Sequence, residues 1–225
     1  MIFLKNESMQ INRISIDSTH ANTDLCKLAV KYPTDKCPYH NESHLHRHAY
    51  TSIYNLLFSQ LRYKEITIGE VGILDNNSML CWREYFPNAA LFGYEYHDDK
   101  LQKGIRDNLR NATYIHIDVT NEESIKSVFN KNDFFDIIIE DSTHVFEDQI
   151  RFLNVAYKCV KPGGIIVIED IFLKEDENRY VEAIEYIKDY FSSATFIMAN
   201  HDLKFSPGWD NDKLLVLHRN DKVCS

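Results

Sequence analysis

The chain has 225 residues, of which 44% are hydrophobic and 12% aromatic, and this size and composition indicate a packed globular protein rather than a disordered one. Its formal net charge is −9 and its Lys and Arg residues do not cluster, which argues against a nucleic-acid partner, because phosphate binding needs a basic face. A small molecule is therefore the expected partner.

The cysteines and the apolar segments bear on where the protein works. Five cysteines are scattered without a C-x-x-C pair, and their odd number argues against a disulfide framework. A reducing compartment is therefore expected. The sequence does not open with basic residues followed by an apolar stretch, as a signal peptide would. No apolar run approaches the ~20 residues that span a bilayer. These features predict a cytoplasmic protein without a membrane partner and leave homo-oligomerisation open.

Residues 1–65 are expected to form a helical lid or cap on the sheet domain that follows. Helical patterns at 23–31 and 49–61 flank a polar connection that is rich in histidine. Its histidines are His40, His44, His46 and His48. A zinc site is disfavoured there, because no Cys completes a tetrahedral set, and a cap that turns His48 and Tyr50 toward the substrate is preferred.

Short β-rich runs alternate with helical patterns from residue 66 onward. The runs lie at 66–71, 89–95, 112–117, 134–140 and 164–169. This alternation predicts an α/β fold for residues 66–225, with a doubly wound, Rossmann-like and mostly parallel sheet. The runs 194–199 and 213–218 have no helical pattern between them, which predicts a C-terminal antiparallel hairpin.

The turn after the first run is the expected ligand site, because open α/β sheets bind ligands at the carboxyl ends of their strands. It reads Glu70-Val-Gly-Ile-Leu-Asp-Asn-Asn-Ser78 and lacks the pattern G-x-G-x-x-G. Glu70 and Asp75 bring negative charge where a dinucleotide would place its pyrophosphate. The turn therefore disfavours NAD and FAD and suits S-adenosylmethionine, whose sulfonium and ammonium groups are cationic.

Acidic residues also end the next two runs. Glu95, 23 residues after Gly72, is placed to accept hydrogen bonds from a ribose diol, and Asp118 can face the adenine amine. The alternative is that both residues merely cap the helices that follow them. The ordered series of Glu70, Glu95 and Asp118 favours the nucleoside site.

Two of the apolar runs end in a Glu-Asp pair, at 140–141 and at 169–170. Asp141, Glu169 and Asp170 would meet at the ends of neighbouring strands, where they would raise one another's pKa unless a cation lay among them. Such hard oxygen ligands select Mg²⁺, Mn²⁺ or Ca²⁺ rather than zinc. The sequence therefore predicts a metal site of these three carboxylates, with Mg²⁺ as the preferred ion.

His144 is the predicted general base. It lies three residues after Asp141, and an ordinary histidine pKa near ~6.5 suits a base at neutral pH. In the expected reaction a substrate hydroxyl bound at the metal gives its proton to His144 and attacks the sulfonium methyl group in line. The alternative is an exposed loop histidine beside carboxylates that cap helices.

Several segments resemble the metal-dependent O-methyltransferases of the macrocin and mycinamicin type, class I S-adenosylmethionine enzymes that methylate sugar hydroxyls. The resemblance extends roughly from Tyr32 to Asp170. Its segments are Thr34-Asp-Lys36, His48-Ala-Tyr-Thr-Ser-Ile-Tyr54, Glu70-Val-Gly-Ile with Ser78-Met-Leu-Cys-Trp82 and Tyr85-Phe-Pro-Asn-Ala89, Asp141-Ser-Thr-His144, Pro162-Gly-Gly164 and Glu169-Asp170. It implies metal ligation by the three carboxylates and the role of base for His144, with Asp141 as its catalytic neighbour.

The resemblance and the acidic series together predict the residues that contact the cofactor. They are Thr34, Lys36, Tyr50, Glu70, Gly72, Asn76, Ser78, Glu95, Asp118 and Asp141. The sequence departs from the family at Asn76-Asn77, where the family has two glycines, and at Thr143, where it has serine. Asn tolerates the left-handed backbone better than most residues, so the turn can keep its shape.

The leading hypothesis is Mg²⁺-assisted, S-adenosylmethionine-dependent methyl transfer to a small acceptor. The acceptor oxygen would be a hydroxyl or a phosphate-like oxygen of a sugar-type precursor in a polysaccharide or natural-product pathway, and this class rests on the resemblance alone. Two alternatives remain, an NAD-dependent oxidoreductase or epimerase on the same sheet and a non-catalytic module that binds a metal or a nucleoside.

Overall fold

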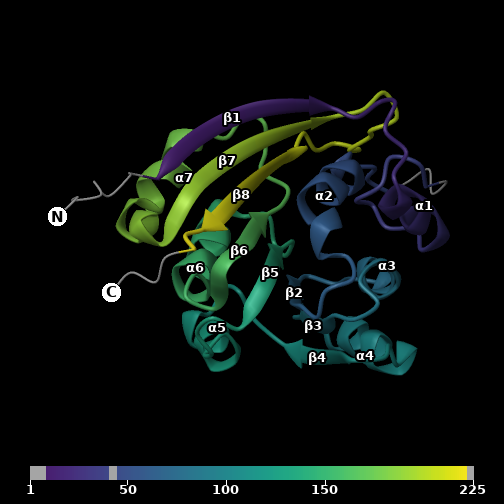
Figure 1. The fold of residues 1–225 in the computed structure, drawn as a ribbon, viewed down its shortest axis with the longest axis horizontal. Coiled ribbons are helices and arrows are strands. Elements are labelled where there is room, and N and C mark those ends of the chain that lie inside the picture. Colours follow the sequence, from purple (N-terminus) through teal and green to yellow (C-terminus); the bar gives the residue numbers. More distant parts are fainter. Residues whose placement is uncertain (1–8, 41–44, 222–225) are drawn as a thin grey trace.

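The computed structural model describes residues 9–40 and 45–221, and a single sheet runs through them (Figure 1). Its strand order is β1-β7-β8-β6-β5-β2-β3-β4. The strands are β1 (Gln10–Asp17), β2 (Thr67–Val71), β3 (Ala90–Glu95), β4 (Ala112–His116), β5 (Phe135–Glu140), β6 (Val160–Ile168), β7 (Phe191–Asn200) and β8 (Lys213–Arg219). The described pairings are parallel except those of β8, which runs antiparallel to β6 and β7. The predicted mostly parallel sheet with a C-terminal antiparallel hairpin is confirmed.

Helices cover both faces of this sheet. They are α1 (Asp24–Lys31), α2 (Tyr50–Phe58), α3 (Asn77–Tyr85), α4 (Asp98–Asp107), α5 (Glu122–Val128), α6 (Phe146–Ala156) and α7 (Glu177–Ala183), with short 3-10 helices at Ser59–Leu61 and Glu185–Tyr190. Residues of α1, α2 and α3 pack in one core, and residues of α5, α6 and α7 pack in the other. Ile137 and Ile139 of β5 face the first core while Ile138 faces the second, which explains the continuous apolar run of that strand.

Side-chain caps fix where several helices begin. The Thr23 hydroxyl accepts a hydrogen bond from the Cys26 backbone N–H at 3.3 Å at the start of α1. The side chains of Asn121 and Asp176 do the same for α5 and α7. Such caps satisfy N–H groups that have no partner within the helix.

The N-terminal segment contains a strand that the sequence analysis did not predict. β1 pairs in parallel with β7, from Gln10 opposite Ser193 to Asp17 opposite Asn200, and lies along the outer edge of the sheet (Figure 1). Only helices were expected between residues 1 and 65, and β1 corrects that expectation. Most β1 residues are exposed or half-buried, so the strand lacks the apolar pattern of a buried one.

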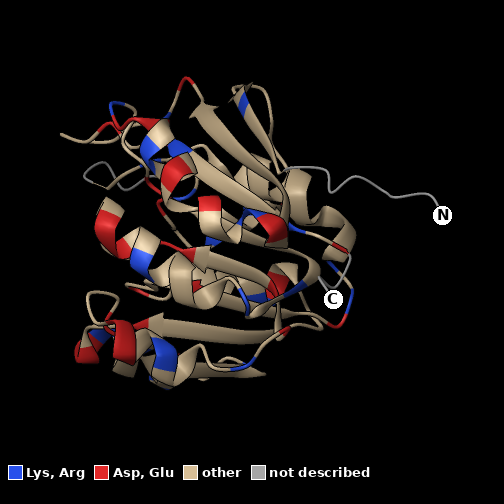
Figure 2. Ribbon diagram, turned by 90° about the vertical axis from the view of Figure 1, so that its left-hand side faces the viewer, with Lys and Arg blue, Asp and Glu red and all other residues tan. Residues whose placement is uncertain are grey.

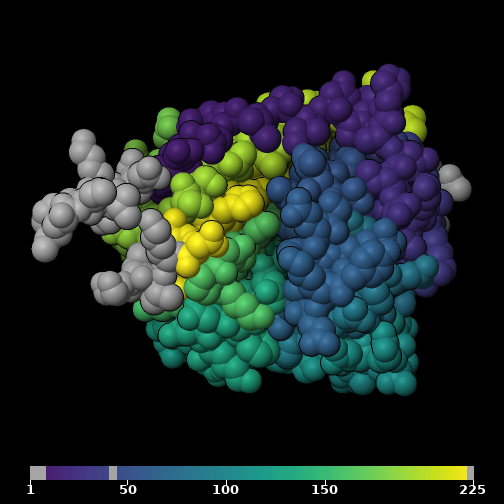
Figure 3. All heavy atoms as spheres, viewed as in Figure 1, coloured from purple at the N-terminus to yellow at the C-terminus, as the bar shows by residue number. Residues whose placement is uncertain are grey.

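Residues 18–40 and 45–65 pack on the sheet and on the C-terminal hairpin (Figure 3). α1 and α2 contribute Leu25, Tyr50 and Ile53 to the first core. Arg47 and Phe205 form an isolated antiparallel bridge, with backbone hydrogen bonds of 2.7 and 3.0 Å between them. The segment is thereby bonded to the loop between β7 and β8.

Acidic and basic residues are mixed along the helices rather than separated by sign, as the colours of the ribbon in Figure 2 show. In α5, for example, Lys126 lies 2.7 Å from Glu122, and in α4 Lys103 lies 3.0 Å from Asp107. None of the helices in the described ranges combines the length and the apolar character that crossing a membrane requires.

Candidate functional site

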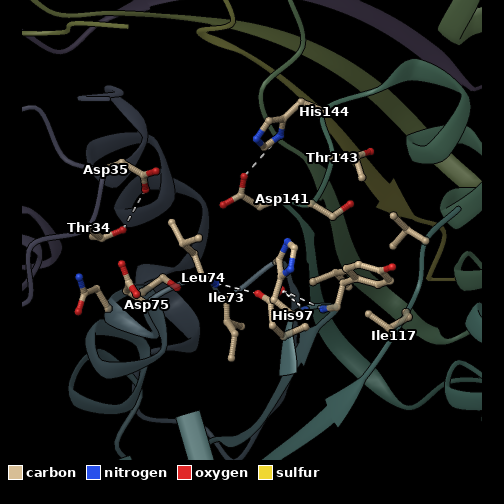
Figure 4. Close-up of a pocket in the computed structure, with 18 of the residues that line it drawn as sticks. Thr34, Asp35, Ile73, Leu74, Asp75, His97, Ile117, Asp141, Thr143 and His144 are labelled. Carbon is tan, nitrogen blue, oxygen red and sulfur yellow. Dashed lines mark hydrogen bonds and ion pairs between the residues drawn. The ribbon is translucent and has the colours of Figure 1, made fainter. Parts of the chain in front are cut away.

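A cavity of about 560 Å³ opens at the carboxyl ends of β2, β3, β4 and β5 (Figure 4). Its lining comes from the turns that follow these strands, at 71–75, 95–97, 117–120 and 141–144, and from 33–36 of the N-terminal segment. This volume is typical of sites for small molecules. Open α/β sheets bind ligands at this edge, so the cavity lies where the sequence analysis expected one.

Most of the predicted site residues line the cavity, and the others are buried outside its lining. Those in the lining are Thr34, Lys36, Gly72, Ser78, Glu95, Asp118, Asp141 and His144. Those outside the lining are Tyr50, Glu70, Asn76, Glu169 and Asp170, all of them buried. Figure 4 shows Asp141 and His144 facing each other on one side of the cavity, with Ile73, Leu74 and His97 on another.

The turn after β2 brings two strand ends into close contact. Gly72 has φ +87°, and a Cβ atom there would lie 2.0 Å from the carbonyl oxygen of Asp141. Farther along, Asn76 has φ +67° and precedes α3, and its side-chain amide donates to Asp107 Oδ2 at 2.9 Å. The left-handed backbone expected at this position is therefore present, and the Asn76 side chain is engaged with Asp107.

Substitution of Gly72 by Ala is expected to displace the Asp141 turn. We expect a loss of about 1–3 kcal/mol in the free energy of unfolding, because the added methyl group must push the Asp141 carbonyl away and the positive φ is strained. Urea unfolding measures this loss. Gly208 is the matched control, since its φ is +76° but a Cβ added there would meet no described atom within 4 Å beyond its chain neighbours. Equal losses in both variants would contradict the importance of the contact with Asp141.

The carboxylate of Glu95 is held rigidly at the end of β3. Its Oε2 accepts from the Leu74 N–H at 3.0 Å, and its Oε1 accepts from the Tyr96 and His97 N–H groups at 2.9 Å each. The N-cap residue of α4 is His97. Glu95 is therefore fixed at the cavity wall by three backbone groups and is not itself the N-cap.

Asp118 lies at the next strand end, and its Oδ1 accepts from the backbone N–H and the hydroxyl of Thr120 at 2.9 and 2.7 Å. The N-cap of the following helix is Asn121, whose side chain accepts from Glu123 and Ser124. Neither Glu95 nor Asp118 is the N-cap of the helix that follows it, so the structure does not support the alternative in which both serve as N-caps.

A buried lysine lies among three carboxylates of the site. Lys36, 2% exposed, places Nζ 2.8 Å from Glu169 Oε2 and 3.4 Å from Glu70 Oε1, and it also donates to Asp141 Oδ2. Burial alone lowers the pKa of Lys36, but the attraction of these carboxylates outweighs it and raises that pKa well above its ordinary value. One ammonium group thus joins the N-terminal segment to the ends of β2, β5 and β6.

Two tyrosines of α2 hold the second Glu-Asp pair. The Tyr54 hydroxyl donates to Glu169 Oε1, and the Tyr50 hydroxyl donates to Asp170 Oδ1 at 2.7 Å. Both oxygens of Glu169 therefore have partners, because Lys36 bonds the other one. Burial raises the pKa of Glu169 to about 7. α2 thus fixes the carboxylates that the sequence analysis assigned to a metal.

His144 lies between two aspartates at the cavity wall. Its Nδ1 is 3.8 Å from Asp141 Oδ1, and its Nε2 is 3.6 Å from Asp170 Oδ2, both too long for hydrogen bonds. His144 and Asp170 have φ angles of +59° and +58°, a strained conformation that clusters at functional sites. Burial lowers the pKa of His144, which favours the neutral imidazole that a base requires.

Glu140 supports the turn that carries His144. It is fully buried, and its Oε1 accepts hydrogen bonds from the backbone N–H and the hydroxyl of Ser142. Burial raises the pKa of Glu140 to about 7. The sequence analysis assigned no role to the first residue of this Glu-Asp pair, and the structure gives it one in shaping the turn at 141–144.

Sequence analysis missed a buried histidine-aspartate pair beside the same site. His48 Nδ1 lies 2.9 Å from Asp212 Oδ1, and His48 Nε2 lies 3.6 Å from Asp170 Oδ2. Burial alone lowers the pKa of His48, but Asp170 and Asp212 outweigh it and raise that pKa to about 9. His48 belongs to a segment of the resemblance, but nothing in the sequence pointed to Asp212, which precedes β8.

The histidines of the N-terminal connection do not gather around one point. His40 Nε2 lies 2.6 Å from the carbonyl oxygen of His46, and the His46 ring stacks on that of His48 at 5.4 Å. His44 lies outside the described residues. Among the described side chains, the group whose ligand atoms come close enough to hold a metal is Asp141, His144 and Asp170, within 4.8 Å of one another.

An exposed indole lies beside His144, outside the cavity lining. Trp209, 45% exposed, contacts the rings of His144, His46 and Phe172, with ring centroids 6.0, 5.8 and 5.6 Å away. It lies in the loop between β7 and β8, where the sequence analysis left its role open. The structure places it beside the predicted base.

Comparison with known sequences finds relatives that match part of the chain. No family model matches it. One relative is the 8-demethyl-8-(2-methoxy-alpha-L-rhamnosyl)-tetracenomycin-C 3'-O-methyltransferase of Streptomyces olivaceus. It is 27% identical over 161 residues, and the alignment covers 66% of this chain and 37% of that protein. The mycinamicin VI 2''-O-methyltransferase of Micromonospora griseorubida is 26% identical, with 66% and 36% covered. The demethylmacrocin O-methyltransferase of Streptomyces fradiae is 26% identical, with 68% and 38% covered.

These relatives confirm the predicted resemblance to the macrocin and mycinamicin type as a similarity of sequence. The chain spans well under half the length of each relative.

Solved structures share the architecture. MycE, a methyltransferase from the mycinamycin biosynthetic pathway solved with Mg, SAH and mycinamycin VI, aligns with a TM-score of 0.64 at 19% identity, over 89% of this chain and 54% of that chain. The CurJ carbon methyltransferase aligns with a TM-score of 0.54 at 10% identity, over 76% and 52%. The fold is that of class I methyltransferases. At these identities the likeness concerns the fold alone.

The class I methyltransferase fold accounts for the grouping of the site residues. Its parallel strands lie in the order β5, β2, β3, β4, and at or just after their carboxyl ends stand Asp141, Gly72, Glu95 and Asp118, all of which line the cavity. Acids from separate turns meet because the carboxyl ends of parallel strands share one edge. Lys36 comes from the N-terminal segment, outside the alternation of strands and helices.

Proposed function

We propose that the chain is an S-adenosylmethionine-dependent O-methyltransferase that acts with Mg²⁺ on a hydroxyl of a sugar-type acceptor. The observation that carries the proposal is that His144, flanked by Asp141 and Asp170, lies at the wall of the same cavity as the rigidly held Glu95. The names of the curated relatives, all sugar or macrolide O-methyltransferases, support it.

The cavity fits a nucleoside with a cationic centre. Ile73, Leu74 and Ile117 offer apolar surface for the adenine, and Glu95 offers a carboxylate for the ribose diol. Asp118 is proposed to face the adenine amine. The remaining proposed contacts come from the turn after β2 and from the cap, namely Thr34, Lys36, Tyr50, Glu70, Gly72, Asn76, Ser78 and Asp141.

The acidic centre fits a hard divalent ion. Asp141 Oδ1 and Asp170 Oδ2 are turned toward His144 rather than toward Lys36 or Tyr50. Each oxygen of Glu169 has one protein partner and keeps further acceptor capacity, because a carboxylate has about four acceptor sites. We propose Asp141, Glu169 and Asp170 as ligands of Mg²⁺ or Mn²⁺.

The chain's own residues would position the acceptor and move its proton. When bound, S-adenosylmethionine supplies an electrophilic methyl group and Mg²⁺ supplies a Lewis acid that makes a hydroxyl more acidic. His144 takes the hydroxyl proton on Nδ1, which has no hydrogen-bond partner among the described residues. Asp170 near Nε2 stabilises the imidazolium. The cap excludes water from the site.

The acceptor is proposed to bind beside Trp209. Its exposed indole lies next to His144, and a flat aromatic face suits the apolar face of a sugar ring. A polysaccharide or natural-product precursor with a phosphate-like oxygen belongs to the same proposal. We also propose a cytoplasmic location, which the buried free thiols of Cys26, Cys37, Cys81 and Cys159 support, and homo-oligomerisation stays open.

The alternatives receive less support. An NAD-dependent oxidoreductase needs a glycine-rich turn for the pyrophosphate, but the turn after β2 keeps one glycine and brings Asp75 to the cavity. A non-catalytic module gives no reason for a neutral histidine held in strained backbone between two aspartates.

Calorimetric titration with S-adenosylhomocysteine, with Mg²⁺ and with EDTA, tests the proposed function. We expect binding in both conditions, because the nucleoside contacts lie away from the metal ligands. Absence of binding in both would contradict the proposal. Binding without any methyl transfer to rhamnosides would leave the cofactor site standing and contradict the acceptor class.

Substitution of Glu95 by Gln is expected to lower the affinity for S-adenosylhomocysteine about tenfold, because hydrogen bonds to a charged acceptor contribute roughly 1.5–3 kcal/mol. Calorimetry measures the change. Asp99→Asn is the matched control, since it removes one charge from an exposed position in the first turn of the neighbouring α4. If both variants lose the same affinity, the effect is general electrostatics and Glu95 does not bind the ribose.

A further inference from the structure

The outer edge of β1 has no partner strand among the described residues. β1 is the first strand in the order of the sheet and pairs with β7 on its inner side (Figure 1). It is eight residues long and its register with β7 runs without a shift, whereas β4 at the other edge has five residues. Unpaired N–H and C=O groups can bind another strand, so proteins usually protect an edge by short length, by Lys or Pro, or by a bulge. β1 has none of these four features.

Alternate residues of β1 present their backbone groups to this free edge. The Ser18 N–H donates to the Asn200 carbonyl oxygen at 2.9 Å, so position 18 faces β7. Backbone groups of successive residues in a strand point to opposite sides, so the even-numbered residues face β7 and the odd-numbered ones face outward. The outward N–H and C=O groups are therefore those of Ile11, Arg13, Ser15 and Asp17.

The sequence of β1 is complementary to itself when a second copy runs antiparallel to it. A two-fold axis at Ser15 places Arg13 opposite Asp17 of the second copy, and the reverse pair follows by symmetry. On the other face of the sheet the same axis places Ile14, which is 45% exposed, opposite Ile16. Opposite charges and apolar side chains that lie directly across an antiparallel pair stabilise it.

Neighbouring registers lack this complementarity. Opposite residues must lie on the same face of the sheet, so the two-fold axis has to pass through a residue. An axis at Arg13 would set two arginines against each other, which is destabilising. An axis at Ile14 would set Ile11 against Asp17. The register centred on Ser15 is the one that pairs the opposite charges.

Both charged side chains keep capacity for this contact. Arg13 Nε donates to Glu177 Oε2 at 2.6 Å, which leaves guanidinium donors for a second carboxylate. Asp17 Oδ1 accepts from the N–H and the hydroxyl of Thr19 at 2.9 and 2.6 Å. Asp17 Oδ2 has no hydrogen-bond partner in the part of the chain that the structure describes, so it can accept from Arg13 of a second copy.

We propose that two copies of the chain form a symmetric dimer by antiparallel pairing of their β1 strands about an axis at Ser15. The outward backbone groups of Arg13, Ser15 and Asp17 exchange hydrogen bonds with the second copy, and the two sheets become one continuous sheet. Such a contact uses the same surface on both copies, so it closes at two. Three strands, β7, β8 and β6, separate β1 from β5, so the dimer leaves the cavity accessible and does not rest on the proposed function.

Sedimentation equilibrium of the full chain tests the dimer. We expect twice the mass of one chain at micromolar concentrations. Ser15→Pro removes the outward N–H at the axis and should give single chains, whereas Ser15→Ala keeps that N–H and should keep the dimer. A single-chain mass of the unmodified protein, assemblies larger than two, or an unchanged dimer in Ser15→Pro would overturn the proposal.

Charge exchange tests the register. Arg13→Asp and Asp17→Arg each place like charges opposite each other, so each variant alone should have the mass of one chain. In an equal mixture, one variant supplies two aspartates and the other two arginines, so a heterodimer should form, which also shows that both variants are folded. Lys126→Glu is the control, on the surface of α5, and should keep the dimer. Dimers in the separate variants, or no heterodimer in the mixture, would overturn the proposal.

Discussion

Replacement of His144 by Ala should lower methyl transfer by about 10²–10⁴-fold, the usual contribution of a positioned general base. His144 lines the cavity and lies between Asp141 and Asp170. Its lowered pKa keeps the imidazole neutral and able to take a proton. The affinity for S-adenosylhomocysteine should stay unchanged, because the proposed nucleoside contacts lie at the ends of β2, β3 and β4. Initial rates and calorimetry on the same preparation measure the two quantities.

The control for this prediction is His20→Ala, which removes an exposed imidazole that does not line the cavity. It should keep both turnover and affinity. Turnover within about threefold of the unmodified enzyme in His144→Ala would exclude His144 as the base. A parallel loss of cofactor affinity would instead assign it to binding.

Lys36→Met should destabilise the fold by about 3–5 kcal/mol, because removal of one partner leaves buried charges without compensation. The Lys36 ammonium lies among Glu70, Asp141 and Glu169, and methionine supplies the same length without the charge. Urea unfolding in EDTA measures the loss. Lys31→Met is the control: Lys31 pairs with Glu84 at the surface, where both side chains are largely exposed, and it should change the free energy of unfolding little.

The deficit of Lys36→Met should also depend on pH. The pKa of Glu169 in the folded protein is about 7, above its ordinary value of 4.5. The contribution of Glu169 to the free energy of unfolding is therefore fully present below about pH 4.5 and is lost as the pH rises through about 7. Lys36 lowers this pKa in the unmodified chain, so its removal enlarges the loss. The deficit should therefore be greater at about pH 8 than at about pH 5. A deficit independent of pH would contradict the role of Lys36 as the counter-ion.

The sheet could be predicted from the sequence because its central strands are buried on both faces. Such strands give continuous apolar runs, as in β5, and each run ends where acidic residues begin. The same logic predicted that Gly72, Glu95, Asp118 and Asp141 would line one cavity. Strand ends of a parallel sheet share an edge, so order along the chain is enough to bring them together.

The features that could not be predicted depend on contacts between residues far apart in the chain, which no local sequence pattern encodes. β1 is a half-exposed edge strand, so its weak alternation gave no signal. Asp212 lies 164 residues from His48 in the chain, and Lys36 meets its carboxylates only because the N-terminal segment packs against the sheet. The sequence analysis expected Lys36 at the cofactor, and the pairing with Glu70, Asp141 and Glu169 became visible only in three dimensions.

The pairing of β1 with β7 sets the order in which this molecule can mature during synthesis. Gln10 must wait for Ser193, 183 residues later, which at roughly 5–20 residues per second takes about 10–40 s on the ribosome. Lys36 pairs with Glu70, Asp141 and Glu169, so its set of partners is complete only after residue 169 has been synthesised. The central strands can therefore form before either the β1 edge or the full set of ion pairs around Lys36 exists.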